Sequence, residues 1–176
     1  MKYLRRLMTF LASRMVIITL CAALLVTAFY MAFNMGSAYI LVTEGFEKRV
    51  DVCLTRQEYT ELNKYFSVGF LTNDPVLAAS VSLESPYIPY NITGYDYDIK
   101  VEKLKAWPWD DNISCIITEY VTNITGTVKN GYTDVASINP PAWRSGRYYV
   151  GLERQGGKWV IGAIVQDDNY RDPTAS

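Results

Sequence analysis

The feature that most limits what this chain can become is an uncharged stretch near its N-terminus. No charged residue occurs from Met15 to Thr43, and most of the side chains are apolar. About 20 apolar residues in a helix cross the hydrocarbon core of a bilayer, which is roughly 30 Å thick. A soluble protein rarely keeps so long a helix apolar on every side. The stretch therefore predicts a membrane-spanning helix.

Such a stretch is either a secretory signal that is removed or an anchor that stays. A signal has an apolar core of about 7–15 residues, then small residues and a polar mature start. The small-residue site here, VTA at residues 26–28, is followed by more apolar sequence up to Phe33. A lipoprotein signal would need a small residue before Cys21, where the chain has Leu20. We therefore expect an uncleaved anchor over residues 15–43.

The charges on the two sides of this stretch predict its orientation. Four basic residues precede it (Lys2, Arg5, Arg6 and Arg14), whereas all 18 acidic residues follow it. Basic flanks stay on the cytoplasmic side of a membrane. We therefore expect a cell-membrane protein with a cytoplasmic tail over residues 1–14, an extracytoplasmic domain over residues 44–166 and a C-terminal tail over residues 167–176.

The composition narrows the classes of function. The chain has no histidine, so the commonest general base and metal ligand is missing. The part beyond the span is acidic and has no basic cluster, which argues against nucleic-acid binding. We expect no metal and no cofactor. Cys53 and Cys115 could form one disulfide bond or be small buried side chains, and we favour the second.

In the part of the chain beyond the span, the sequence predicts helices before strands. Apolar residues recur at helical spacing from Ala38 to Leu54, so the membrane helix should continue into the domain, where Gly45 could bend it. A capping box at Thr55 to Glu58 should start a second helix. Its buried face should consist of Tyr59, Leu62, Tyr65 and Phe66. Asp74 and Pro75 should start a third, short helix.

Strands follow. Apolar and charged residues alternate from Tyr95 to Val101, residues 113–128 are rich in β-formers, and residues 147–154 and 158–165 flank Gly156-Gly157 as a hairpin. The order predicts an α+β fold with about four antiparallel strands. In the last strand, Trp159, Ile161, Ala163 and Val165 should share the face that packs on the helices.

Helices followed by this sheet, with a Trp opening the last strand in GKWVIGAIV, resemble the nuclear transport factor 2-like family. The resemblance covers about residues 38–166 and carries no catalytic motif. It implies a curved sheet wrapped around N-terminal helices as a cone. With its single anchor, the chain resembles assembly-factor subunits of type IV secretion and conjugation machines. A cystatin-like or ring-building domain, as in sporulation channel proteins, is the alternative.

No set of residues for catalysis can be assembled from the sequence. The acidic candidates are Asp96, Asp98, Asp110, Asp111 and Glu119. Asp96 and Asp98 fall on the solvated face of a strand, and Asp110 and Asp111 lack the spacing of a calcium loop. We therefore expect a protein that is not an enzyme.

Aromatic residues are concentrated in the strand half, where they can be core, a protein interface or the lining of an apolar pocket. The candidates for an interface or pocket are Tyr87, Tyr90, Tyr95, Tyr97, Trp107, Trp109, Trp143 and Tyr149. Gly36, Ser37 and Ala38 are small enough to allow contact with a second helix.

These features lead to two hypotheses. In the first, which the sequence favours, the chain is a scaffold that assembles with itself and with other proteins of a bacterial envelope. In the second, it is a tethered module that holds a small apolar ligand in an aromatic-lined cone. A pocket that stays open favours the second, and a pocket plugged by Trp and Tyr favours the first. Three glycosylation triplets, at Asn91, Asn112 and Asn123, do not decide the origin.

Overall fold

The computed structural model describes residues 2–56, 59–82, 84–133 and 136–170. Its elements are α1 (Lys2–Thr55), the 3-10 helix η1 (Tyr59–Lys64), α2 (Val68–Asn73), α3 (Pro75–Val81), β1 (Tyr90–Leu104), β2 (Asn112–Val128), β3 (Gly146–Gln155) and β4 (Lys158–Gln166). The strands form one antiparallel sheet in the order β1-β2-β3-β4. The predicted α+β class and the four-stranded meander are confirmed.

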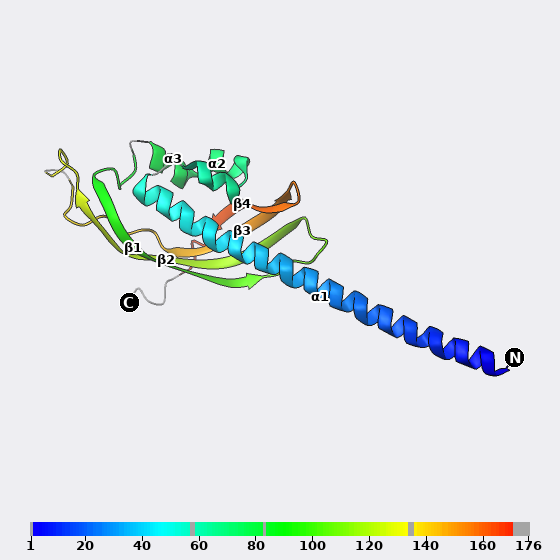
Figure 1. Ribbon diagram of the computed structural model, residues 1–176. Helices are drawn as coiled ribbons and strands as arrows, with labels where there is room; N and C mark the ends of the chain where they lie inside the picture. The colour runs from blue at the N-terminus through cyan, green and yellow to red at the C-terminus, as the bar shows by residue number, and fades with distance from the viewer. Residues whose placement is uncertain (1, 57–58, 83, 134–135, 171–176) are drawn as a thin grey trace.

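The sheet is curved, and the C-terminal part of α1 lies across its concave side (Figure 1). The short helix α3 packs on the opposite side of α1, whereas α2 lies against the edge strand β4. The hydrophobic core fills the space between α1 and the sheet, with Val42, Phe46, Ile117, Val150 and Ile161 completely buried. The domain is therefore built around the helix that also carries the apolar stretch.

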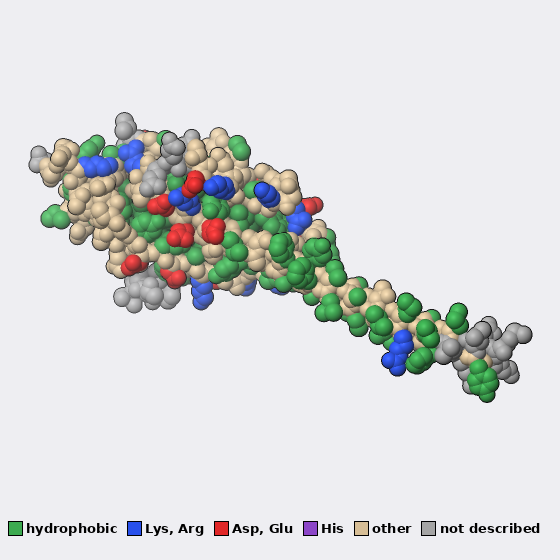
Figure 2. Space-filling view, viewed as in Figure 1, with side chains coloured by type: hydrophobic (Ala, Val, Ile, Leu, Met, Phe, Trp, Pro, Cys, Tyr) green, Lys and Arg blue, Asp and Glu red, His purple; other side chains and the backbone are tan. Residues whose placement is uncertain are grey.

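α1 is a single helix of 54 residues. Within the described residues, it is the helix that is long and apolar enough to cross a membrane. Its N-terminal part projects away from the domain with exposed apolar side chains, as Figure 2 shows. Ala38 and Val42, by contrast, are completely buried in the domain core. The predicted continuation into the domain is confirmed, and the helix is not interrupted at Gly45.

Gly45 permits close packing. A Cβ at this position would lie 3.0 Å from Ile161 Cδ1 and 3.1 Å from Tyr65 Cβ. The backbone of β4 is fixed at the same point, because Ile161 N donates to Tyr65 O (2.8 Å) and Ser67 N donates to Ile161 O (2.9 Å). Glycine thus lets α1 approach the sheet where the segment after η1 crosses it.

The second predicted helix begins differently. Thr55, expected to cap it, is the last residue of α1, and its hydroxyl donates to the carbonyl of Asp51 (2.7 Å). Arg56 follows with a φ of 59°, the left-handed conformation that ends helices. Glu58, the other half of the predicted capping box, lies outside the described residues. The helix is the short η1, and Leu62 at its centre is buried as expected.

The third helix follows its sequence signal. Asp74 is the N-cap of α3, Pro75 is its first residue, and Asp74 Oδ1 accepts a hydrogen bond from Val76 N (3.0 Å). Asp74 N also donates to Phe70 O at the end of α2. One aspartate therefore joins the two short helices.

The last strand departs from strict alternation. Trp159 and Ile161 are buried, as predicted. The register of β3 and β4 then shifts, because Gly151 pairs with Ala163 whereas Leu152 pairs with Ile161. The one extra residue in β4 reverses which of the following side chains face the core. The prediction is therefore wrong for Ala163 and Val165, which are exposed, and Ile164 packs on the core instead.

The turn between β3 and β4 matches its sequence. Gln155 pairs with Lys158, and the two residues between them, Gly156 and Gly157, have φ angles of 57° and 80°. Two consecutive positive φ angles are the conformation of a type I′ turn, which glycine adopts without strain. The predicted hairpin is confirmed.

Candidate functional site

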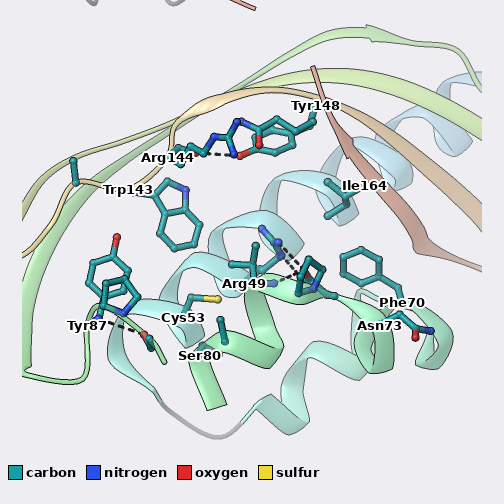
Figure 3. Close-up of a pocket in the computed structure, with 18 of the residues that line it drawn as sticks. Arg49, Cys53, Phe70, Asn73, Ser80, Tyr87, Trp143, Arg144, Tyr148 and Ile164 are labelled. Atoms are coloured by element: carbon teal, nitrogen blue, oxygen red, sulfur yellow. Dashed lines mark hydrogen bonds and ion pairs between the residues drawn. The ribbon is translucent and has the colours of Figure 1, made fainter. Parts of the chain in front are cut away.

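A pocket of about 830 Å³ lies between the helices and the β3–β4 half of the sheet. This volume is within the range of small-molecule sites. Figure 3 shows Trp143 and Tyr87 on one side of the pocket, Phe70 and Ile164 on the other, and Arg49 between them on α1. The pocket thus uses all the layers of the domain, and most of its wall is apolar.

A buried ion pair holds the helical wall of this pocket together. Arg49 Nε lies 2.7 Å from Asp74 Oδ2, and Arg49 Nη2 lies 3.1 Å from Asp74 Oδ1. Both side chains are almost completely buried, with exposures of 5% and 3%. The guanidinium binds the carboxylate through two parallel hydrogen bonds, the strongest arrangement for such a pair. The charge of Arg49 is therefore already balanced within the protein.

A third ionisable group, Glu119, lies completely buried in the sheet. Its Oε2 accepts a hydrogen bond from Trp143 Nε1 (3.1 Å), which joins it to the pocket wall. Burial raises the pKa of Glu119 to about 7, although the Arg49 charge and the Trp143 hydrogen bond both act to lower it. The hydroxyl of Tyr97 lies near this carboxyl and also acts to lower its pKa, but neither that hydroxyl nor Glu119 Oε1 makes a hydrogen bond of good geometry within the described residues.

This pKa predicts a pH dependence that Glu119→Gln should remove. Between pH 4.5, the ordinary value, and about 7, the folded protein binds more protons at Glu119 than the unfolded chain does. The free energy of unfolding should therefore fall as pH rises through this window and level off above it, by about 1.4 kcal/mol per unit of pKa difference. The Gln variant should gain stability relative to the parent across this window. Chemical unfolding of both proteins at several pH values measures the difference, and a constant difference would contradict the prediction.

Cys53 is the cysteine among the residues that line the pocket. Its thiol is buried, and burial raises its pKa to about 11. A thiol that stays protonated at neutral pH is a poor nucleophile. Cys53 and Cys115 are both buried and free in the structure, in agreement with the favoured prediction that they are small core side chains.

Two of the eight predicted aromatic candidates line the pocket, Tyr87 and Trp143. Their rings stack with centroids 6.3 Å apart. Tyr90 is buried beyond the pocket, where its hydroxyl donates to Ser137 O (3.1 Å). Tyr95 and Tyr97 pack their rings on the core under α1, so these three residues have structural roles.

The other three candidates lie on the surface. Trp107 and Trp109 stack on each other in the β1–β2 turn, and neither lines the pocket. Tyr149 is exposed on the outer face of the sheet. The pocket therefore contains fewer of the predicted aromatics than expected, because residue type does not tell which face of a strand or turn a side chain occupies.

Several pocket residues were missed by sequence reasoning. Arg49 and Asp74 are 25 residues apart and carry no motif, and Phe70, Tyr148 and Ile164 resemble ordinary core residues. The Asp74-Pro75 helix start was recognised, but it gives no sign that the carboxylate also meets an arginine. Only the packing of α3 against α1 brings this pair together.

The acidic candidates have the surface roles expected of them, with one exception. Asp96 and Asp98 are exposed, and Asp110 accepts a hydrogen bond from Trp107 N (2.9 Å) within its turn. Glu119 is the exception, because it is buried. No group of three or more Cys, Asp or Glu side chains that could hold a metal ion occurs in the described part of the chain.

The small residues predicted for helix–helix contact are not equivalent. Ala38 is completely buried in the core of its own domain, so it cannot contact a second helix, and the prediction is wrong for this residue. Gly36 is exposed and Ser37 is half-buried. For these two residues, contact with a second helix stays a prediction.

Comparison with known proteins gives no match among family models, curated proteins or solved structures. The resemblance to the nuclear transport factor 2-like family therefore stays a prediction.

Proposed function

We propose that this chain is a single-pass membrane protein whose extracytoplasmic domain binds a small, largely apolar ligand in its pocket. One observation carries the proposal: the space of about 830 Å³ between helices and sheet is lined by aromatic side chains but not filled by them. A cleft of this size with a mostly apolar wall is the usual form of a small-molecule site.

The charges in the wall favour a ligand without net charge. Arg49 is neutralised by Asp74. Arg144, the other arginine among the lining residues, pairs with Asp168 at the surface (3.4 Å). The carboxyl of Glu119 lies behind Trp143 and does not line the pocket. The Trp143 and Tyr87 rings present a flat apolar surface on one side. A neutral molecule with a planar hydrophobic part fits this wall best.

The membrane location and orientation belong to the same proposal. They are supported by the length and composition of α1 and by the basic residues that precede it. A cone of the nuclear transport factor 2-like kind is supported by the curved sheet around α1. Because α1 enters the core without a linker, the pocket would be held at a constant distance from the bilayer.

Filling the pocket should abolish ligand binding. Ala79 lines the pocket on α3, so the ring of Ala79→Phe should occupy the space that a ligand needs. Ala78 is on the same helix but exposed, and Ala78→Phe is the matched control. Aminoanthracene, a flat neutral amine, serves as the probe. Native mass spectrometry of the full chain, released from mild detergent, should show one probe molecule on the parent and on Ala78→Phe and none on Ala79→Phe.

Two results would contradict the proposal. One is a parent protein that retains no probe after the detergent is removed. The other is equal binding by Ala79→Phe and Ala78→Phe, which would place the probe elsewhere on the protein.

A scaffold role is the second candidate, because the outer face of the sheet carries an apolar stripe. Tyr149 pairs with Ile116 on β2 and with Val165 on β4, so the three side chains lie in a row across the sheet. Tyr149 and Val165 are 47% and 61% exposed. An exposed row of this kind suits contact with another protein. This candidate would become the better one if the pocket bound no probe.

A further inference from the structure

The β1–β2 turn lies at the end of the domain from which the N-terminal part of α1 projects (Figure 1). Asn34 of α1 is tied to both turns at this end. Its Nδ2 donates to Trp107 O in the β1–β2 turn (3.4 Å), and its Oδ1 accepts from Arg154 Nη2 beside the β3–β4 turn (3.4 Å). Asn34 thus marks the point on the helix where the domain begins.

This turn exposes two tryptophans. Trp107 and Trp109 are 45% and 69% exposed, and their rings stack with centroids 5.4 Å apart. The turn that holds them is well fixed, because Ala106 is completely buried and Trp107 N donates to Asp110 Oδ2. Figure 2 shows hydrophobic side chains gathered where the helix joins the domain.

The length of the exposed part of α1 indicates where the β1–β2 turn would lie relative to a bilayer. From Met15 to Phe33 the helix is apolar, exposed over most of its surface and about 19 residues long. At 1.5 Å per residue it measures about 28 Å, close to the roughly 30 Å of a hydrocarbon core. Arg14 would then lie at one boundary of the bilayer and Asn34 at the other. Residues 35–43, which the sequence assigned to the span, would belong to the domain.

We propose that Trp107 and Trp109 insert into the lipid headgroup layer on the outer side of the membrane and fix the depth of the domain. This inference rests on the proposed membrane anchoring and is independent of the pocket. Tryptophan prefers this layer, because its ring is apolar and its N–H remains able to bond water or headgroups. Trp107 and Trp109 lie beside Asn34, at the depth where the helix would leave the hydrocarbon core.

The charges around the turn do not favour a particular lipid. Lys103 and Lys105 are exposed before the turn and would attract anionic headgroups, whereas Asp111 is exposed within it and would oppose them. The contact should therefore rest on the two rings. Uncharged phosphatidylcholine is accordingly the lipid for the test.

The test compares the full chain in two samples of phosphatidylcholine vesicles. One sample has ordinary lipid, and the other has lipid brominated near the headgroup end of its acyl chains. Bromine quenches nearby tryptophan fluorescence. The chain has four tryptophans, so brominated lipid should remove up to half of the emission of the parent. A Trp107→Tyr/Trp109→Tyr variant keeps aromatic rings in the turn and should lose this quenching. Trp143→Phe, which changes a pocket residue away from the turn, should keep it.

The outcomes separate the two proposals. A parent that floats with the vesicles but is not quenched, and whose turn tryptophans are quenched by aqueous acrylamide, would overturn the headgroup contact and leave the anchor intact. A free surface for another protein would then explain the two rings. A parent that does not float with vesicles would overturn the anchor and the headgroup contact together.

Discussion

Replacing Arg49 by methionine is expected to lower the free energy of unfolding by about 3–5 kcal/mol. The substitution leaves the carboxylate of Asp74 without its partner at a position where only 3% of the side chain is exposed. A buried charge that loses its counter-charge cannot recover the hydration it gave up on folding. The methionine fills most of the volume, so the effect reports the charge and not a cavity.

Two further variants test this explanation. Arg49→Met/Asp74→Asn should recover much of the loss, because asparagine removes the charge but keeps an oxygen to cap Val76 N. Arg144→Met is the matched control. Its ion pair with Asp168 is exposed, with side-chain exposures of 76% and 81%, and such pairs contribute about 0–1 kcal/mol. Chemical unfolding in mild detergent, followed by near-ultraviolet circular dichroism, measures all three. Equal losses for Arg49→Met and Arg144→Met would refute a special role for the buried pair.

Replacing Trp159 by alanine is expected to cost about 3–5 kcal/mol. The indole is 8% exposed and belongs to the main core cluster together with Leu62 and Phe66. The guanidinium of Arg154 lies over its ring, with its carbon 4.7 Å from the ring centroid. Alanine would leave a cavity that strand β4, fixed to Tyr65 by its backbone, could not close.

Trp109→Ala is the matched control for this loss. It removes an indole that is 69% exposed and should cost about 1 kcal/mol, the contribution of its stacking on Trp107. The same unfolding measurement serves both variants. If Trp159→Ala unfolded at the denaturant concentration of the parent, the register of β4 described above would be wrong.

The elements with strong local signals were predictable. The apolar stretch, the Asp74-Pro75 helix start and the Gly156-Gly157 turn each depend on a few neighbouring residues, and each is present in the structure. The capping box at Thr55 was the misleading signal. Its residues have the right types, but α1 continues to Thr55 and is stopped by the left-handed Arg56 that follows. A helix already packed by its core face is extended more easily than a new one is started.

The site was less predictable than the fold. Tyr87 and Trp143 could be proposed because aromatic residues often line pockets, yet Arg49 and Asp74 had no local signature. The prediction that Ala163 and Val165 face the core is wrong for the same reason, the lack of a local signal in the sequence. A shift of one residue in the pairing with β3 reverses the alternation, and nothing in the β4 sequence announces it.

The sequence by itself determined the features that depend on local chemistry. A long uncharged stretch determines a helix suited to a bilayer, alternation determines strands, and two glycines determine the turn between the last two. The tertiary structure decided where the apolar stretch ends and the domain begins, because Ala38 and Val42 are as apolar as the residues before them and differ only in being buried. It also decided that Arg49 meets Asp74 and that a pocket remains beside them. Both depend on contacts between segments far apart in the chain, whose geometry no local pattern contains.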